Sequence, residues 1–353
     1  MMAAGAIGAN NPGYEYGVLL PHFGRNASRK RLIDGARQIE QYGFDSVWVR
    51  DHIVFHPHAH EDQNKTHVDP FVVLSAVAGA TDRIKLATGT LIPHRHPILA
   101  ALMIGSLDFV AGPGRLIIGW GTGTYDHEFA AIGMAGWDRR EVIEEQIKIV
   151  RKLWAGGSVD HDGKYYQFEG VEIQPVPGGP EGRSVPIWYG GTSLAAVRRA
   201  VEYCDGWIPG RMPKSVFTKC MQRMERLAGE AGKPVPDAGT IPVVVPGRTV
   251  KDALRWVNEE RLLEEVNASY AKGNGAAFTS ANDLDGAVIL GPADRIGEEV
   301  RAWQAVGGRH FVFDLRPSFD EWEEGLVTIG EEVLPELLRG DGRAIAPEAA
   351  AVR

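Results

Sequence analysis

The residues best suited to chemistry follow short apolar segments of the chain. Segment 44–49 (FDSVWV) is followed directly by Arg50, Asp51 and His52. An imidazole next to a carboxylate can act as a general acid or base near neutral pH. We therefore predict that His52 and Asp51 are catalytic residues. In the alternative interpretation, Asp51 caps a helix or a turn and His52 only fills the space beside it.

Two further apolar segments carry glycines and threonines. Segment 84–91 (IKLATGTL) has a glycine inside a strand-like pattern, which indicates a bulge, a close ligand approach or a simple bend. Segment 115–120 (RLIIGW) runs into alternating glycines, which expose backbone N–H groups to a ring or an anion, although tight turns use the same pattern. We favour a bound ligand at both segments. The predicted cofactor-binding residues are Thr88, Gly89, Thr90, Gly121, Thr122 and Gly123.

A fourth segment, 186–189 (PIWY), is followed by Gly190, Gly191, Thr192 and Ser193 and then by a helical pattern. Bare N–H groups at a helix N-terminus, together with two hydroxyls, form a cradle for phosphate. A capped turn with Thr192 or Ser193 as the N-cap would look the same in the sequence. We predict a phosphate site formed by these four residues, because late loops of α/β barrels often hold phosphate.

Histidines are concentrated in the segment that follows Asp51. Alternating imidazoles can bind zinc, so a metal-dependent hydrolase is the rival class of enzyme. Metal ligands need a fixed orientation, however, and a long loop does not supply it. We predict no metal site and a solvated or substrate-gating loop. The histidines concerned are His52, His56, His58, His60 and His67.

The order of elements predicts how these residues come together. Short apolar runs alternate with longer amphipathic ones, as in β–α units on a parallel sheet, and eight such units predict an α/β fold, a (β/α)₈ TIM barrel with insertions. An open doubly wound sheet is the alternative, but no GxGxxG sequence follows the first strand. In a barrel the carboxyl ends of the strands form one site. The expected strands cover 16–20, 44–49, 84–91, 115–120, 186–189, 206–208, 241–245 and 310–315.

The expected domain organisation is a single barrel domain over residues 14–340. Residues 1–13 and 341–353 are expected to be terminal tails. An insertion is expected around 213–291, and its Gly, Asn and Ala content near 272–281 suggests a mobile lid. Residues 158–174 alternate around Asp162-Gly163, which predicts a hairpin outside the barrel.

Composition excludes several classes of function. The chain has 353 residues with 38 Lys and Arg against 46 Asp and Glu, a net charge of −8, so we expect no nucleic-acid partner. Its two cysteines, Cys204 and Cys220, fit neither a disulfide framework nor a zinc spacing. No signal peptide and no long apolar run is found, so we expect a cytoplasmic protein without a membrane partner.

The chain resembles the bacterial luciferase-like family of flavin- and deazaflavin-dependent oxidoreductases over nearly all of 16–338. Several ordered pieces carry the resemblance, and they are specific together although each alone is weak. They are Gly43–Trp48 leading to Asp51-His52, Leu86–Thr90 with Pro97 beyond, Gly114–Leu116, Gly121–Gly123, Glu128-Phe129, Pro186–Trp188 with Gly190-Gly191, Asp205–Trp207 and Glu331–Pro335.

The strand-end Asp-His and the Gly-x-Gly-Thr-Gly loop look most like the branch of this family that uses coenzyme F420, a deazaflavin. The resemblance implies hydride transfer between F420 and a small organic substrate, with an FMN-dependent monooxygenase and a non-catalytic flavin-binding relative as alternatives. It implies a cis peptide bond at Gly89-Thr90 against the ring, His52 near the reactive ring carbon with Asp51 as its polar neighbour, and a homodimer. Thr122 and Gly123 match positions that bind the ring, and Gly190, Gly191 and Thr192 match the phosphate-tail site.

The substrate pocket is expected above this ring. Sugar-phosphate dehydrogenases of the same branch have a glutamate where this chain has Thr124, and an aromatic residue where it has His56. These departures speak against glucose 6-phosphate as the substrate. The residues expected to contact the substrate are His22, His56, Trp120, Thr124 and Tyr125.

Overall fold

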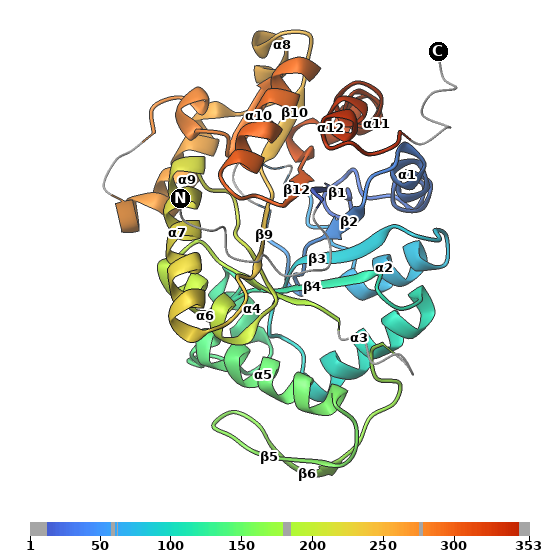
Figure 1. Cartoon of the computed structure of the whole chain (residues 1–353), viewed down its shortest axis with the longest axis vertical. Helices are drawn as coiled ribbons and strands as arrows, with labels where there is room; N and C mark the ends of the chain where they lie inside the picture. Colours follow the sequence, from blue (N-terminus) through green and yellow to red (C-terminus); the bar gives the residue numbers. More distant parts are fainter. Residues whose placement is uncertain (1–12, 58–60, 62, 179–184, 275–277, 346–353) are drawn as a thin grey trace, which may run out of the picture.

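Eight parallel strands close into a barrel with helices on its outside (Figure 1). The computed structural model describes residues 13–57, 61, 63–178, 185–274 and 278–345. The predicted TIM barrel is confirmed. Around the barrel the strands follow in the order β1 (Glu15–Leu19), β12 (His310–Phe313), β9 (Asp237–Thr240), β8 (Gly206–Ile208), β7 (Ile187–Gly190), β4 (Leu116–Trp120), β3 (Lys85–Leu91) and β2 (Ser46–Val49).

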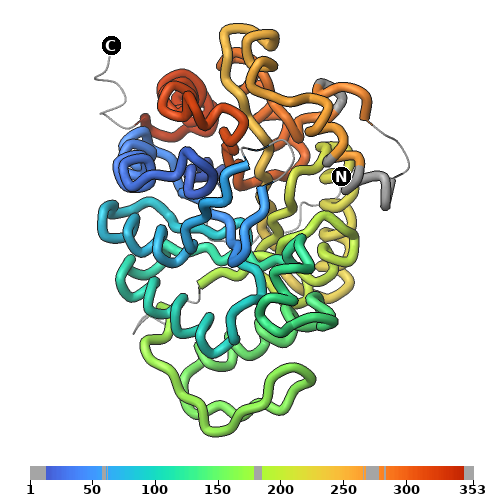
Figure 2. Tube along the Cα trace, turned by 180° about the vertical axis from the view of Figure 1, so that it is seen from behind, coloured from blue at the N-terminus to red at the C-terminus, as the bar shows by residue number. Residues whose placement is uncertain are grey.

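Helices connect the strands and cover the barrel, as the trace in Figure 2 shows from the opposite side. Helix α1 (Arg29–Tyr42) begins after Ser28, whose hydroxyl accepts a hydrogen bond from the N–H of Arg31, and ends at Gly43 with φ of 94°. A serine before the first turn and a glycine after the last are start and stop signals that the sequence itself carries. The other helices up to the seventh barrel strand are α2 (Pro70–Ala78), α3 (Pro97–Ala111), α4 (Asp126–Ala131), α5 (Arg139–Trp154), α6 (Leu194–Tyr203) and α7 (Lys214–Ala231).

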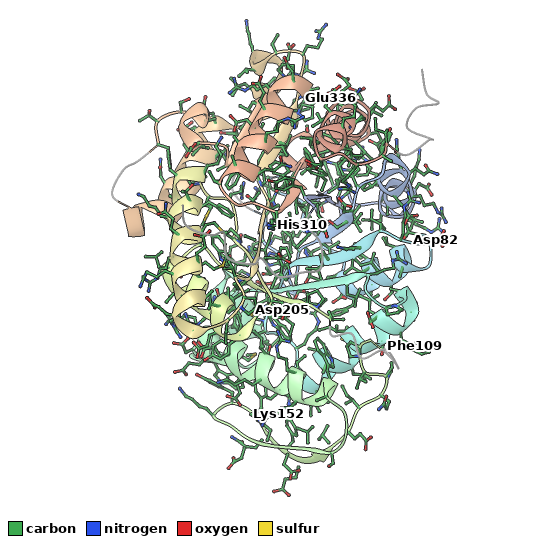
Figure 3. The ribbon with its side chains drawn as sticks, viewed as in Figure 1. Asp82, Phe109, Lys152, Asp205, His310 and Glu336 are labelled. Atoms are coloured by element: carbon green, nitrogen blue, oxygen red, sulfur yellow. The ribbon has the colours of Figure 1, made fainter. Side chains whose placement is uncertain are left out.

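Aromatic side chains fill the interior of the barrel. The rings of Trp48, Trp188 and His310 lie 5.2 to 6.1 Å apart, and the hydroxyl of Ser46 accepts from Trp48 Nε1 and bonds His310 Nε2. Figure 3 shows His310 near the centre of the molecule. A Cβ at Gly206 would lie 2.5 Å from the Trp188 ring, so only glycine leaves it room. Because the interior is packed, a ligand can enter only at an end of the barrel.

The prediction of the seventh strand at 241–245 is wrong. The barrel uses β9 instead, while β10 (Val243–Pro246) pairs in parallel with β11 (Val288–Gly291) in a separate two-stranded sheet. The sequence of β9 is DAGT, which has almost no apolar signal. A Cβ at Gly239 would lie 2.5 Å from Ile208 Cδ1, so the packing of Ile208 requires glycine at this position. The remaining elements of this region are α8 (Val250–Leu254), α9 (Glu259–Asn274), a 3₁₀ helix (Ala281–Leu284) and α10 (Ala293–Ala305).

The expected insertion at 213–291 is therefore too broad, since α7 and β9 inside it belong to the barrel. The lid expected near 272–281 includes residues 275–277, which lie outside the described residues, as do residues 1–12 of the expected N-terminal tail. The hairpin is confirmed: β5 (Val159–Asp162) and β6 (Gln167–Val171) pair antiparallel at the lower edge of Figure 1. Within the described residues, no helix is long and apolar enough to cross a bilayer.

The chain closes with helical segments that pack back onto the start of the barrel. They are a 3₁₀ helix (Arg316–Glu321), α11 (Trp322–Val327), a π-helical segment (Thr328–Val333) and α12 (Leu334–Gly340). The expected tail from 341 begins with docked residues. Asp341 accepts a hydrogen bond of 2.6 Å from the Tyr16 hydroxyl, and Arg343 forms an ion pair of 2.7 Å with Asp45.

Candidate active site

Two neighbouring hollows lie at the carboxyl ends of the barrel strands. The first, called here the mouth cavity, has a volume of about 290 Å³. The second, called the outer groove, has about 940 Å³ and runs between the start of α6 and the segment from α4 to α5. Both are lined by Thr122, Gly190 and Gly191, so they adjoin. The sequence-predicted residues that line the mouth cavity are Asp51, His52, Gly89, Thr90, Gly121, Thr122, Gly123, Thr124, Gly190 and Gly191.

The ends of β3, β4 and β7 meet around the side chain of Thr90. The peptide bond between Gly89 and Thr90 is cis, as predicted, and the register between β3 and β4 shifts there. A Cβ added to Gly121 would lie 2.2 Å from Thr90 Oγ1, and one added to Gly190 would lie 2.7 Å from Thr90 Cγ2. The space left by these two glycines is therefore filled by Thr90, which lets the three strand ends approach closely.

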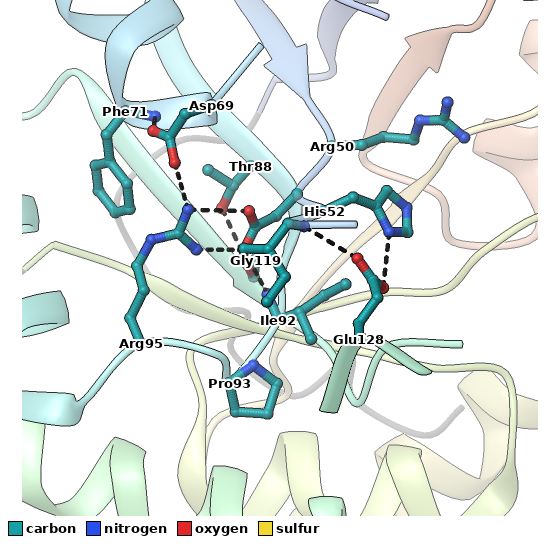
Figure 4. A network of polar contacts seen from close by, with 12 residues as sticks. Arg50, His52, Asp69, Phe71, Thr88, Ile92, Pro93, Arg95, Gly119 and Glu128 are labelled. Atoms are coloured by element: carbon teal, nitrogen blue, oxygen red, sulfur yellow. Dashed lines mark hydrogen bonds and ion pairs between the residues drawn. The ribbon is translucent and has the colours of Figure 1, made fainter. Parts of the chain in front are cut away.

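Glu128 holds His52 in place (Figure 4). Glu128 lies on α4, and its Oε2 is 3.0 Å from His52 Nδ1. Its Oε1 accepts the N–H groups of Ile53 and Val54 at 3.0 and 3.1 Å. Since an ionised carboxylate only accepts, Nδ1 of His52 carries the proton and Nε2 is left to exchange one with a molecule in the cavity.

The Glu128 carboxyl is fully buried. Burial raises its pKa, but the bonds from His52 and from the two backbone N–H groups outweigh burial, so its pKa lies below the ordinary value. The group therefore stays charged at neutral pH and fixes both the ring and the loop that follows it.

Asp51 does not contact His52. Its carboxylate accepts from Arg95 at 2.5 and 3.1 Å and from the N–H of Ile92 at 3.0 Å, and Arg95 also bonds Asp69 at 2.6 Å. Figure 4 shows Arg95 and Asp69 of this network apart from the pair of His52 and Glu128. The prediction that Asp51 is the polar neighbour of His52 is thus wrong. Asp51 instead ties the end of β2 to the segment after β3.

Three of the predicted site residues are buried and line neither cavity. His22 is enclosed, with Nδ1 2.9 Å from the carbonyl of Leu20 and Nε2 3.0 Å from the N–H of Arg50, which donates to it. Trp120 packs into the core. Thr88 donates its hydroxyl to the carbonyl of Gly119 at 3.0 Å. We therefore correct the predicted substrate contacts of His22 and Trp120 and the predicted cofactor contact of Thr88. These three side chains are buried in the protein behind the cavity wall.

The other loop histidines that the structure describes differ in position: His56 is at the surface, whereas the His67 ring lies inside, 5.4 Å from the ring of His52 and 5.0 Å from that of His22. His56 is exposed, and its ring is 4.2 Å from that of His127, while the Tyr125 ring is 5.7 Å from that of His52. His58 and His60 lie outside the described residues. Among the residues that are described, no group of three His, Cys, Asp or Glu side chains could hold a metal ion.

The start of α6 forms one wall of the outer groove. Ser193 is its N-cap, and its hydroxyl accepts from the N–H of Ala196 at 3.1 Å, so the capped turn considered as an alternative is present. Thr192 and Ser193 both line the groove. Free N–H groups at the start of a helix attract anions whether or not a cap is present. Three arginines line the same groove, and each forms an ion pair: Arg139 with Asp126, Arg140 with Asp138 and Arg199 with Glu144.

Sequence reasoning missed Glu128 and Arg95 as parts of the site. Glu128 lies 76 positions from His52 along the chain, and the sequence marked it only as part of the Glu128-Phe129 piece of the family resemblance, without a role in the site. Arg95 follows β3 in a segment without periodicity. Long-range ion pairs of this kind leave no local pattern in a single sequence.

Comparison with known proteins places this chain in a family. The family model for luciferase-like monooxygenase matches residues 11–310. A curated F420-dependent glucose-6-phosphate dehydrogenase from Nakamurella multipartita is 27% identical over 349 residues, covering 89% of this chain and 96% of the relative.

Two solved structures share the fold. One is an F420-dependent secondary alcohol dehydrogenase with an F420–acetone adduct, at a TM-score of 0.74, 19% identity, and 91% and 98% coverage of the two chains. The other is the FMN complex of a type II Baeyer–Villiger monooxygenase from Pseudomonas putida, at 0.73, 23% identity, and 92% and 98% coverage.

The Glu128 carboxylate predicts a pH-dependent stability. Because its pKa in the folded chain lies below the ordinary value of 4.5, its contribution is present above that pH and is lost as the pH falls. We expect Glu128→Gln to lower the free energy of unfolding by about 1–2 kcal/mol at pH 7. Urea denaturation should show this difference shrinking below about pH 4.5. Glu172→Gln, at an exposed position directly after β6, serves as control. A loss of unfolding free energy in Glu128→Gln that is as large below pH 4.5 as at pH 7 would contradict the assignment.

Proposed function

The chain belongs to the luciferase-like monooxygenase family, and on that basis we propose that it is an oxidoreductase passing hydride between coenzyme F420 and a small organic substrate. The observation that carries the proposal is the meeting of three glycine-bearing strand ends beside His52, with an arginine-lined groove next to them. The curated relative named for F420 is similar over most of both chains and favours the deazaflavin over FMN.

The residues present suit such a cofactor. The mouth cavity offers a backbone-lined wall at Gly89, Gly121 and Gly123 for a flat ring. The adjoining outer groove offers Thr192, Ser193 and the positive end of α6 for a phosphate-bearing tail. When bound, F420 supplies a ring carbon that gives or accepts hydride.

The protein's own groups supply positioning and a proton. His52 lines the cavity and exchanges the proton that accompanies hydride transfer through Nε2, while Glu128 holds the ring by Nδ1. Asp51 acts as an anchor of the β2 end and takes no part in proton transfer. Thr124 lines the cavity with a hydroxyl, which has no acidic proton to offer near neutral pH, so His52 is the residue assigned to acid–base work.

The same fold also carries FMN enzymes, so an FMN-dependent monooxygenase is the second candidate. The two candidates predict different cofactor preferences and different dependence on oxygen, because a deazaflavin transfers hydride and a reduced flavin also reacts with oxygen.

Titration of the purified chain with F420 and with FMN, followed by visible absorbance and fluorescence, tests the proposal. We expect F420 to bind and His52→Gln to bind it equally well. The variant should lose about 100- to 10,000-fold in F420 reduction with a panel of secondary alcohols and hydroxy acids. Preferential FMN binding would favour the monooxygenase. Wild-type turnover by His52→Gln would remove His52 from the mechanism, and F420 binding without turnover of any compound by the wild type would indicate a non-catalytic relative.

The close approach at Thr90 predicts a paired result for two glycines of the mouth cavity. Gly121→Ala places a methyl group 2.2 Å from Thr90 Oγ1 and must displace Thr90, so we expect F420 affinity to fall about tenfold or more. Gly210→Ala lines the same cavity, but its Cβ would meet only Thr192 Cγ2 at 4.0 Å. This control should bind F420 nearly as the wild type does. Equal affinities in both variants would place the ring elsewhere.

We also propose that the chain forms a homodimer through α2 and α3, which lie side by side on the barrel (Figure 1). Both helices are apolar on their outer as well as their inner faces. The outward residues are Val72, Leu99, Phe109 and Val110, with exposed fractions of 63, 49, 75 and 63%. Exposed large apolar side chains on two neighbouring helices are typical of a subunit interface.

Phe109→Glu tests this interface. We expect the wild type to sediment as a dimer and the variant as a monomer, because a carboxylate cannot be buried there without a partner. Val235→Glu, which replaces an exposed apolar residue outside α2 and α3, is the control and should leave the mass unchanged. A monomeric wild type, or a dimeric Phe109→Glu, would contradict the proposed interface.

A further inference from the structure

Arg50 is a buried arginine that lines the mouth cavity and whose guanidinium has a hydrogen-bond partner on one side only. It follows Trp48 by two positions at the end of β2, so its side chain continues on the inner side of the barrel wall. It is 7% exposed and lines the cavity. Its guanidinium stacks on the Phe23 ring at 3.6 Å, and its Nη1 bonds Glu61 at 3.1 Å.

The other edge of this guanidinium has no acceptor. Among the described residues, neither Nε nor Nη2 of Arg50 has a hydrogen-bond partner, and both atoms are buried. Buried donors without a partner are rare in folded proteins, because each one loses its bonds to water without replacement. Burial also lowers the pKa of Arg50 to about 10, although Glu61 and Asp314 act in the opposite direction.

Two other arginines of this chain place that edge on a carboxylate, whereas the Nε–Nη2 edge of Arg115 bonds the Ile84 carbonyl and the Thr81 hydroxyl. Arg31 uses Nε and Nη2 on the two carboxylate oxygens of Glu323 at 2.8 and 2.6 Å. Arg316, which also lines the mouth cavity, uses Nε on Asp314 and shares Glu61 with Arg50. The Nε–Nη2 edge thus meets a carboxylate in both cases, in the two-bond arrangement that guanidinium groups favour.

Among the described residues, no carboxylate bonds the Nε–Nη2 edge of Arg50. The acidic side chain among the described lining residues is Asp51, which is bound to Arg95, while Glu61 and Asp314 bond Nη1 of Arg50 and the guanidinium of Arg316. We propose that the substrate of this enzyme is a small organic acid whose carboxylate binds the Nε–Nη2 edge of Arg50, a conclusion that rests on the proposed function.

A carboxylate fits this edge better than a phosphate group does. One planar monoanion is satisfied by the two parallel donors, whereas a phosphate near charge −2 can bond the same edge but has three oxygens that require further donors. Nη1 of Arg50 is held by Glu61, and Arg316 is held by Glu61 and Asp314. Because Nε and Nη2 are closed off from solvent, a neighbouring side chain must move for the carboxylate to reach them, and the proposal includes that movement.

The test measures binding by the full chain without added cofactor. Thermal unfolding is followed with lactate, with 3-hydroxybutyrate, with the methyl ester of each acid and with inorganic phosphate, all at constant ionic strength. We expect both acids to raise the unfolding midpoint saturably and the esters to have no such effect. Arg50→Lys keeps the charge beside Glu61 but loses the two-donor edge, so the acids should bind about tenfold more weakly. Arg31→Lys removes the same type of edge far from the cavity and should bind them as the wild type does.

Each other outcome overturns the carboxylate site. Esters that bind as tightly as the acids, phosphate that binds in their place, or wild-type affinity in Arg50→Lys would do so. The comparison of acids with esters on the wild type stands even if Arg50→Lys does not fold. A chain that binds the acids but not F420 would refute the proposed cofactor and leave the carboxylate site in place, so the two failures are distinguishable.

Discussion

The close approach of three strand ends around Thr90 is the constraint on which the site depends. A hydroxyl and a methyl group fill the space that side chains at Gly121 and Gly190 would need, so β3, β4 and β7 end within contact of each other. That contact sets the backbone wall of the mouth cavity and brings the start of α6 beside it. Interior packing of this density tolerates no added methyl group without displacement.

Two buried carboxylates near His52, Asp51 and Glu128, have different hydrogen-bond partners. Asp51 is bound to Arg95 and to the N–H of Ile92, which holds the end of β2 against the segment after β3. Glu128 lies on α4, the helix that follows β4, and its bond to Nδ1 fixes the tautomer of the His52 ring. Asp51, next to the histidine in sequence, thus holds the backbone, whereas Glu128, distant in sequence, is the residue that bonds the His52 ring. Alternation along an extended chain accounts for this, since successive side chains point to opposite sides.

The sequence by itself determined the type of fold and the positions of most strand ends. Hydrophobic periodicity and the helix caps at Ser28 and Gly43 act locally, so they can be read from neighbouring residues. The glycine inside the third strand indicated an irregularity there, and the family resemblance implied the cis bond at Gly89-Thr90. One strand was misplaced because β9 has little apolar character, whereas the apolar run at 241–245 belongs to a separate sheet. Periodicity reports burial, and burial alone does not name the partner strand.

Only the tertiary structure decided which polar groups meet. It paired Glu128 with His52, enclosed His22 and Trp120 beneath the site, and left one edge of Arg50 without an acceptor. Each of these outcomes depends on side chains from elements far apart in the chain, whose approach is fixed by the closure of the barrel. Residue type and spacing show that a group is able to form an ion pair or a hydrogen bond. Which group lies within reach of it is a property of the packed fold.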